Sequence, residues 1–376
     1  MQKKINSIFK ERFGKDGIVY ASAGRINLIG EHTDYNGGFV FPGAIDKVIM
    51  AEIAPNGTEK VRVFSVDINE YAEFGLKEED APTQQWARYI FGICREIIKR
   101  GGKVEGFDAV FAGNVPLGAG LSSSAALESC FAFALNDLFN GNTIDKFELA
   151  RIGQSTEHNY CGVNCGIMDQ FASVFGKKDN LMRLDCRSME FEYFPFKADG
   201  YKLVLLEVKH ALVDSPYNKR RQSCERVAKT LGVETLRDAT MEMLNGVRSD
   251  ITAEDYFRAK YVIEEKDRVL AVCDALVKGD LETVGAKMYE THDGLSKDYE
   301  VSCVELDYLN DIARECGVTG SRIMGGGFGG CTINLVKDDL YDNFIATAKK
   351  KFNARYGHEP VVIPVIISDG ARKVEE

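Results

Sequence analysis

Features that mark several other protein classes are missing from this 376-residue sequence or scarce in it. The formal net charge is −10, and the densest basic cluster is the short run Lys219-Arg220-Arg221. Because nucleic-acid binders carry a broad basic face, we expect neither a nucleic acid nor an anionic membrane as a partner. The sequence has no run of about 18 apolar residues, so we expect no membrane span. Two lysines near the N-terminus lack the apolar stretch of a secretory signal, so we expect none.

Metal-binding and disulfide patterns are also scarce. The chain has ten cysteines, but no two of them form a C-x-x-C pair, and only five histidines accompany them. Cys161 and Cys165 are the nearest pair, and no second pair stands near them to complete a zinc site. We therefore expect reduced, partly buried thiols in a cytoplasmic protein.

The composition that remains is that of an ordinary folded protein. Hydrophobic residues make up 45% of the chain and charged residues 28%, which disfavours disorder. At about 150 residues per domain, the length indicates two domains or three. Predicted strands and helices are mixed rather than strictly alternating, which indicates an α+β fold with mostly antiparallel sheets. We expect a domain boundary near residue 200, between two runs of strands.

The predicted elements follow from apolar periodicity and from Gly and Pro punctuation. Helices are predicted over residues 5–13, 84–100, 123–139, 144–159, 167–175, 217–231, 253–277, 304–316 and 338–355. Strands are predicted over residues 18–29, 39–53, 60–66, 107–112, 181–184, 190–196, 201–207, 331–336 and 360–367.

A Gly- and Ser-rich segment, residues 113–128, stands between a predicted strand and a predicted helix. Its glycines allow a tight turn and close approach to a ligand, and its serines stand where the helix begins. Free N–H groups and the positive end of a helix dipole make such a place an anion site. A plain strand–turn–helix with a serine cap would show the same pattern. The segment is not a Walker A loop, because no lysine follows its last glycine.

A second Gly-rich segment occupies residues 325–330 and formally matches G-x-G-x-x-G. A dinucleotide fingerprint requires a helix after these glycines, whereas a strand is predicted here. We therefore expect a loop that approaches a substrate or phosphate closely.

A polar run, residues 24–38, separates two apolar strands and has glycines at both ends. Glu31, His32 and Asp34 place hydrogen-bonding groups within four residues, which suits a sugar because each hydroxyl both donates and accepts. Arg25 can hold a carboxylate or a transferring phosphate. Farther along the chain, Glu157 and Asp169 are separated carboxylates that suit two tasks, one facing a hydroxyl and one holding Mg²⁺. A solvated loop and two surface acids are the plainer alternatives.

Together, these segments resemble a known family. Residues 24–38 resemble the galactokinase signature G-R-[VI]-N-L-I-G-E-H-T-D-Y-N. Residues 116–126 resemble the ATP motif shared by galactose, homoserine, mevalonate and phosphomevalonate kinases, and residues 325–330 resemble the third motif of that superfamily. The resemblance covers nearly the whole chain in the right order, and the first motif is close to diagnostic of galactokinases.

The resemblance implies a fold of two α+β domains with the active site between them. The N-terminal sugar- and phosphate-binding domain, residues 1–199, would be like ribosomal protein S5 domain 2. The C-terminal domain, residues 200–376, would be ferredoxin-like and would carry the third Gly-rich motif.

The same resemblance implies a reaction and a set of site residues. ATP, with Mg²⁺, would phosphorylate α-D-galactose at the C1 hydroxyl and give galactose 1-phosphate and ADP, with no obligate protein partner. Asp169 matches the catalytic base and Arg25 the residue that stabilises the transition state. The other matches are sugar contacts at Glu31, His32, Thr33, Asp34, Gly166 and Tyr217, the last within the stretch 210–218; nucleotide contacts at Ser65, Gly118, Ala119, Gly120, Leu121, Ser122, Ser123 and Ser124; and Mg²⁺ ligands at Ser124 and Glu157.

Two related functions fit many of the same features. A kinase for N-acetylgalactosamine or L-arabinose would keep the phosphate loop, but Thr33 and the run 34–38 favour galactose, because N-acetylgalactosamine kinases differ there. A non-catalytic regulator that binds galactose and ATP is disfavoured by the intact Ser-Ala pairing in residues 122–126 and by the presence of Asp169, Arg25 and Glu157.

Overall fold

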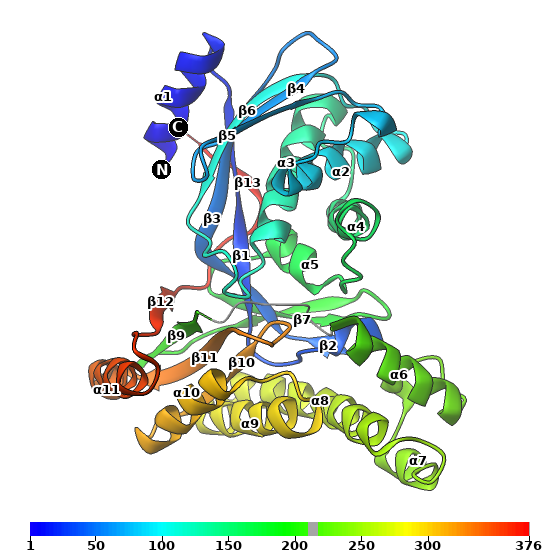
Figure 1. Cartoon of the computed structure of the whole chain (residues 1–376), viewed down its shortest axis with the longest axis vertical. Helices are drawn as coiled ribbons and strands as arrows, with labels where there is room; N and C mark the ends of the chain where they lie inside the picture. Colours follow the sequence, from blue (N-terminus) through cyan, green and yellow to red (C-terminus); the bar gives the residue numbers. More distant parts are fainter. Residues whose placement is uncertain (210–216, 376) are drawn as a thin grey trace.

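The computed structural model describes residues 1–209 and 217–375 (Figure 1). The stretch 210–216, which precedes Tyr217, lies outside the described residues. The helices are α1 Gln2–Phe13, η1 Asp34–Asn36, η2 Glu78–Asp80, α2 Gln85–Lys99, α3 Ser123–Asn140, α4 Lys146–Thr156, η3 Glu157–Cys161, α5 Met168–Phe175, α6 Tyr217–Leu231, η4 Leu236–Asp238, α7 Met241–Gly246, α8 Ala253–Val277, α9 Leu281–Asp293, η5 Gly294–Asp298, α10 Val304–Glu315 and α11 Asp338–Tyr356. The strands are β1 Ile18–Asn27, β2 Phe39–Val40, β3 Pro42–Pro55, β4 Val61–Ser65, β5 Glu70–Phe74, β6 Phe107–Gly113, β7 Asn180–Asp185, β8 Phe191–Pro195, β9 Tyr201–Val208, β10 Gly320–Met324, β11 Gly330–Lys337, β12 Val361–Val365 and β13 Arg372–Lys373.

The upper lobe in Figure 1 is built on a sheet with the strand order β13-β1-β3-β6-β4-β5. Its pairs are antiparallel except for the parallel pair β4–β6. Helices α3 and α5 pack on β1 and β3, while α1 packs on β3 and β6. Alternate residues of β6 therefore enter two cores: Ala109 and Phe111 join the main core, and Val110 and Ala112 join the small core under α1.

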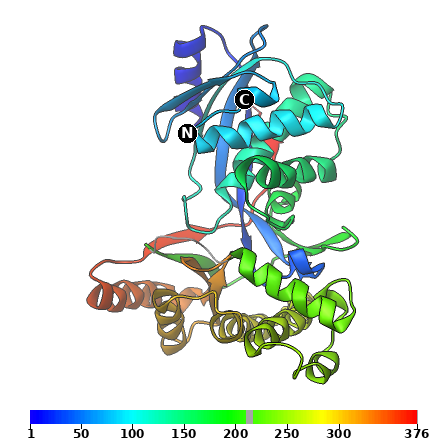
Figure 2. The same ribbon diagram turned by 45° about the vertical axis from the view of Figure 1, so that its right-hand side comes forward.

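The lower lobe contains a second sheet with the order β10-β11-β9-β12 and the helices α6 to α11 (Figures 1 and 2). Strand β9 lies inside this sheet and is apolar on both faces. Leu203 and Leu205 belong to the main core, whereas Val204 and Leu206 belong to the core formed with the lower helices. This sheet is thus buried on both faces, which explains why β9 reads as a continuous apolar run.

Two features connect the lobes: a small third sheet and the path of the C-terminal end of the chain. A small sheet has the order β2-β7-β8. The end of the chain also returns to the first sheet, where β13 pairs with β1 and an isolated bridge joins Ile45 to Ile367. Both the mixed α+β architecture and the mostly antiparallel pairing confirm the sequence prediction. In the part of the chain that the model describes, no helix has the length and apolarity to cross a bilayer.

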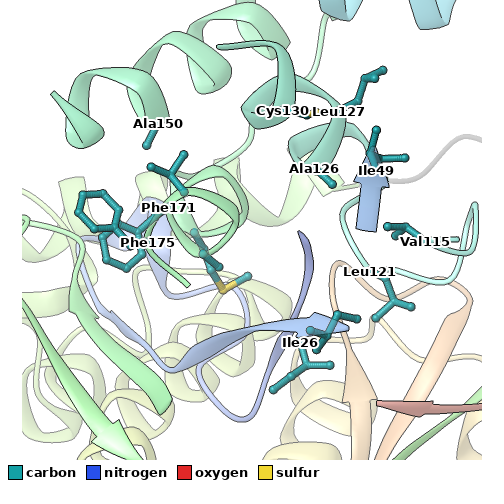
Figure 3. Packing of buried hydrophobic residues seen from close by; sticks show 14 of the residues in the cluster. Ile26, Ile49, Val115, Leu121, Ala126, Leu127, Cys130, Ala150, Phe171 and Phe175 are labelled. Atoms are coloured by element: carbon teal, nitrogen blue, oxygen red, sulfur yellow. The ribbon is translucent and has the colours of Figure 1, made fainter. Parts of the chain in front are cut away.

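The segments singled out in the sequence lie at ends of these elements. The polar run follows β1 and includes η1, the Gly- and Ser-rich segment joins β6 to α3, and the second Gly-rich segment joins β10 to β11. Val115 and Leu121 of the Gly- and Ser-rich segment belong to the same core as Ile26 of β1, and Figure 3 shows all three. The core therefore anchors this loop beside the end of β1.

Candidate active site

Arg25 and Asp169 form the centre of the site. Arg25 lies on β1 at a break in its register with β3, and its side chain is almost fully buried. Its Nε donates at 2.8 Å to Oδ1 of Asp169, which lies in the first turn of α5. Burial alone would lower the pKa of Arg25, but the carboxylates of Asp169 and Glu31 outweigh it and raise that pKa. Arg25 is thus a permanent cation beside the proposed base.

The loop between β6 and α3 is bonded to this pair. Ser122, with a φ of 58°, precedes the first residue of α3, and its hydroxyl donates to Oδ2 of Asp169 at 2.5 Å rather than capping the helix. Arg25 donates through Nη1 to the carbonyl of Gly120 at 2.5 Å and through its backbone N–H to the carbonyl of Leu121 at 3.1 Å. A Cβ at Gly24 would lie 2.7 Å from that same Leu121 carbonyl, so the loop requires glycine there.

Apart from Ser65, the nucleotide contacts predicted from the resemblance lie in this loop and at the start of α3. Ala119 and Leu121 turn their side chains into the core, and Gly118 and Gly120 take positive φ angles that favour glycine. Ser123 and Ser124 begin α3, where the first helical N–H groups have no partner within the helix. The loop therefore offers backbone N–H donors, as an anion site requires.

Ser124 and Glu157 meet at one edge of the site. The Ser124 hydroxyl donates to Oε1 of Glu157 at 2.8 Å, and Glu157 begins η3 directly after α4. Burial raises the pKa of Glu157 to about 7. Within the described residues, no group of three or more His, Cys, Asp and Glu side chains could hold a metal. A hydroxyl with one carboxylate still fits Mg²⁺, which usually keeps waters and takes one or two protein carboxylates together with substrate phosphates.

A cavity of about 190 Å³ joins these pairs to the predicted sugar residues. Arg25 and Asp169 line it, and so do Ser124 and Glu157. The predicted sugar residues among its walls are Glu31, His32, Asp34, Gly166 and Tyr217. Residues far apart in the sequence, from both lobes, thus face one small polar space.

Gly166 makes room for Asp34. A Cβ at position 166 would lie 1.7 Å from Oδ2 of Asp34, so no other residue fits without displacing that carboxylate. Burial raises the pKa of Asp34 to about 6, and the charge of Asp169 adds to this increase. The backbone N–H of Tyr35 donates to Oδ1 of Asp34 and fixes its orientation.

His32 is held as a neutral imidazole. Its φ is 61°, and burial lowers its pKa to about 3. Nε2 lies 3.2 Å from the carbonyl of Gly326, so this nitrogen carries the proton. Nδ1 then accepts from the Tyr35 hydroxyl at 2.8 Å. The ring of Tyr217 packs against it with centroids 5.3 Å apart.

Thr33 differs from the other predicted sugar residues, because its side chain does not line the cavity. Its Oγ1 lies 3.0 Å from the carbonyl of Gly30 and 2.6 Å from that of Phe39. The hydroxyl thus braces the loop that presents Glu31, His32 and Asp34.

A second cleft, of about 580 Å³, shares Ser124 with this first cavity. Ser65, the predicted nucleotide contact at the end of β4, lines it. Residues not identified from the sequence also line this cleft: Asp67, Trp86, Tyr89, Phe111 and Asn114. Trp86 and Tyr89 lie on α2 at helical spacing, a pattern that reads as a core face and conceals their exposure to the cleft.

Family models match the chain in three places. The galactokinase galactose-binding signature matches residues 7–55, the GHMP kinases N terminal domain matches residues 88–177, and the GHMP kinases C terminal model matches residues 273–354. These ranges contain the polar run, the Gly- and Ser-rich segment and the second Gly-rich segment. Fold and site together therefore define a kinase of the GHMP class.

Comparison with individual relatives shows which family of GHMP kinases this chain is most similar to. The galactokinase of Clostridium acetobutylicum is 40% identical over 100% of this chain and 98% of its own length. That of Thermotoga maritima is 40% identical over 93% of this chain and 98% of its own. The crystal structure of Lactococcus lactis galactokinase complexed with galactose has a TM-score of 0.93 at 33% identity and covers 98% of each chain. The chain belongs to the galactokinase family. The Methanococcus jannaschii mevalonate kinase, with a TM-score of 0.67 at 16% identity over 94% of this chain and 99% of its own, shares the fold.

Proposed function

We propose that this enzyme transfers the γ-phosphoryl group of ATP to the C1 hydroxyl of α-D-galactose and releases galactose 1-phosphate and ADP. One observation carries the proposal. The cavity that holds the galactokinase-signature residues Glu31, His32 and Asp34 also holds the Arg25–Asp169 pair, and it meets a second, larger cleft at Ser124. A sugar in the first space, which Asp169 lines, and a nucleotide in the second would meet at Ser124.

Sugar recognition rests on carboxylate acceptors and on aromatic rings that line the cavity. Glu31 and Asp34 present carboxylate oxygens to hydroxyl donors, while His32 and Tyr217 form the aromatic side of the cavity. Gly166 contributes by letting Asp34 reach the cavity. The protein already engages both His32 ring nitrogens, so a sugar hydroxyl bonded to that ring must replace or share one of these contacts.

Asp169 is the proposed base. As the sugar C1 oxygen bonds to the γ-phosphorus, its proton passes to Asp169 and the bond from the γ-phosphorus to the bridging oxygen of ADP breaks. Each carboxylate oxygen of Asp169 already accepts one hydrogen bond, from Arg25 or from Ser122, and each keeps a further lone pair for the sugar. Arg25 offsets the charge on the transferring group. A milder role, in which Asp169 only orients the hydroxyl, fits a loose transition state.

Ser124 and Glu157 are the proposed Mg²⁺ ligands. Magnesium bound there would neutralise charge on the phosphate oxygens of ATP. The N–H groups at the start of α3, together with Ser122 and Ser123, would hold the phosphates. Ser65 and the aromatic side chains of the second cleft would contact the rest of the nucleotide.

The domain organisation follows the same proposal. We divide the chain into residues 1–199, with a fold like ribosomal protein S5 domain 2, and residues 200–376, with a ferredoxin-like fold. The boundary falls in the interval between β8 and β9. The end of the second part then returns to the first sheet, where β13 pairs with β1. We also propose a cytoplasmic enzyme without an obligate protein partner.

A substrate panel tests the function. Release of ADP would be followed with Mg-ATP and D-galactose, N-acetylgalactosamine, D-glucose, L-arabinose, mevalonate or homoserine. Rapid turnover of galactose with little turnover of glucose is the expected result. Preference for N-acetylgalactosamine or L-arabinose would overturn the substrate assignment. Binding of galactose and ATP without ADP release would indicate a regulator instead.

A further inference from the structure

The loop that carries Glu31 is fastened by buried polar groups from the lower lobe. The N–H of Gly30 donates to Oε1 of Glu265 on α8 at 2.8 Å, and the hydroxyl of Tyr261, also on α8, donates to the carbonyl of Glu31 at 3.1 Å. Glu265 is completely buried, and Arg268 and Thr291 donate to its other oxygen. The sugar loop therefore depends on partners more than 200 residues away in the chain.

Arg322 on β10 is the central member of these contacts. Its side chain has 0% exposure and does not line the cavity. The guanidinium donates through Nε to the carbonyl of Leu28 at 2.9 Å, through Nη1 to that of Ile323 at 2.5 Å, and through Nη2 to the carbonyl of Asn27. It thus binds the end of β1, where the sugar loop begins.

Arg322 also fixes one oxygen of Glu31. Oε1 of Glu31 accepts from Nη2 of Arg322 at 3.1 Å and from the N–H of Gly325 at 2.9 Å. Among residues 1–209 and 217–375, no hydrogen bond reaches Oε2. Because Glu31 is 2% exposed and lines the cavity, Oε2 is the oxygen left for a ligand. The bonds to Oε1 thus decide where Oε2 stands.

We propose that Arg322 is a positioning residue for sugar recognition: it holds Glu31 so that Oε2 accepts one hydroxyl of the sugar. The inference rests on the proposed function. Arginine suits this role because its planar fork reaches a carboxylate and backbone carbonyls together, whereas lysine offers a single ammonium. Loss of the fork leaves Oε1 of the buried Glu31 carboxylate with only the Gly325 N–H as a donor, so the carboxylate reorients.

The proposal makes a chemical prediction about the sugar. Removing the hydroxyl that Glu31 binds would cost the wild-type enzyme about 10- to 100-fold in kcat/KM, as a lost hydrogen bond to a charged group does. In a variant that does not hold Glu31 in place, this hydrogen bond is already weakened, so removing the hydroxyl lowers kcat/KM less. The same deoxy sugar should therefore lose its penalty in both Glu31→Gln and Arg322→Lys.

The experiment compares D-galactose with its 2-, 3-, 4- and 6-deoxy analogues in the wild type, E31Q and R322K. R258K is the matched control, because Arg258 is similarly buried and pairs with Glu254 and Glu300 away from the cavity. For R322K, we expect the galactose KM to rise by about tenfold or more while the ATP KM stays within about twofold. R258K should keep both KM values and the full deoxy penalty.

Each outcome decides the question. If R322K keeps the wild-type penalty for every deoxy sugar and an unchanged galactose KM, the positioning role is wrong. If R322K does not fold, R322Q is measured with the same deoxy sugars, because it also removes the guanidinium bonded to Oε1 of Glu31. A full wild-type deoxy penalty in R322Q would then overturn the proposal, and loss of the penalty for the sugar identified with E31Q would support it. A wild type that does not phosphorylate galactose would contradict the proposed function itself.

Discussion

Ser122 and Arg25 each hold one oxygen of Asp169: the hydroxyl donates to Oδ2 at 2.5 Å and the guanidinium to Oδ1 at 2.8 Å. The phosphate loop and the proposed base are thus parts of one hydrogen-bonded unit. A shift of the loop on nucleotide binding would be transmitted directly to the carboxylate that we propose as the base. Variants at these positions should therefore change the rate of transfer more than the affinity for galactose.

Asp169→Asn separates base catalysis from mere orientation. Asparagine keeps the size of the side chain and one acceptor but cannot take the proton. We expect kcat to fall by about 10²- to 10⁴-fold, with galactose binding retained in calorimetry. A loss below about tenfold would leave Asp169 with only the orienting role.

Ser122→Ala removes the second support of the same carboxylate. We expect kcat/KM to fall by about ten- to a hundredfold, as for a lost hydrogen bond to a charged group, with the melting temperature changing little. Steady-state kinetics and a thermal melt measure both. An unchanged kcat would mean that Arg25 alone positions Asp169.

Gly166→Ala tests the contact between Gly166 and Asp34. The new Cβ would meet Oδ2 of Asp34 at 1.7 Å and displace it. We expect the galactose KM to rise by at least about tenfold, while the ATP KM stays near the wild-type value. Gly246→Ala is the control, because a Cβ there meets nothing within 4 Å. Equal effects of the two substitutions would contradict the assignment of Asp34 to the sugar.

Glu157 predicts a pH dependence of metal binding and of stability. Its pKa is about 7 in the folded protein, above its ordinary value of 4.5. Since Mg²⁺ requires the ionised carboxylate, the apparent affinity for Mg²⁺ should fall as pH drops below about 7. Between the two pKa values the folded state binds more protons than the unfolded state, so the contribution of Glu157 to stability falls as pH rises.

Glu157→Gln checks both parts of that prediction. The variant should lose Mg²⁺-dependent activity, yet without metal it should melt at a higher temperature than the wild type at pH 8. This difference should shrink at pH 5, where Glu157 is already protonated in the folded protein. Thermal melts with EDTA at the two pH values measure it. A variant less stable than the wild type at pH 8 would contradict the assigned cost of burying this charge.

Trp86 is the single tryptophan of the chain and lines the second cleft. Tryptophan emission, excited selectively over the tyrosines, therefore reports on that cleft. We expect ADP or ATP to change the emission in a saturable way and galactose alone to change it little. A change in emission with galactose but not with nucleotide would contradict the assignment of this cleft to the nucleotide.

Much of the fold could be predicted from the sequence, because long amphipathic segments carry a clear period. Helices α6 and α8 were confirmed at the predicted bounds, 217–231 and 253–277. Helix α9 was missed because Gly285 interrupts its pattern. The structure explains this glycine: a Cβ there would lie 2.0 Å from the carbonyl of Thr319, where α9 packs directly against the segment leading into β10. Tertiary packing, not local propensity, selects the residue.

Strand β10 was missed for a related reason. It carries Ser321 and Arg322, both fully buried, and such residues rarely indicate a buried strand. The partner of Arg322, Glu31, is 291 positions away, so no local pattern reveals the pair. The short strands β5 and β13 and the helix α7 were also not predicted.

The site was predicted unevenly. Family resemblance indicated Arg25, Asp169, Ser124 and Glu157, and the structure brings them together around one cavity. It also indicated Thr33, whose hydroxyl turns instead to the carbonyls of its own loop. The aromatic wall of the second cleft was not identified, because side chains on one helix face serve a core and a cleft with the same spacing.

Phosphorus NMR of the wild-type reaction tests the central claim most directly. Mg-ATP and D-galactose would be mixed with catalytic enzyme, and the phosphorus resonances followed over time. We predict that the γ-phosphate signal of ATP is replaced, in equal amount, by a sugar-phosphate resonance coupled to the anomeric proton, together with ADP. Formation of inorganic phosphate in its place, or phosphorylation at another hydroxyl, would contradict the claim that Asp169 faces the C1 hydroxyl of galactose.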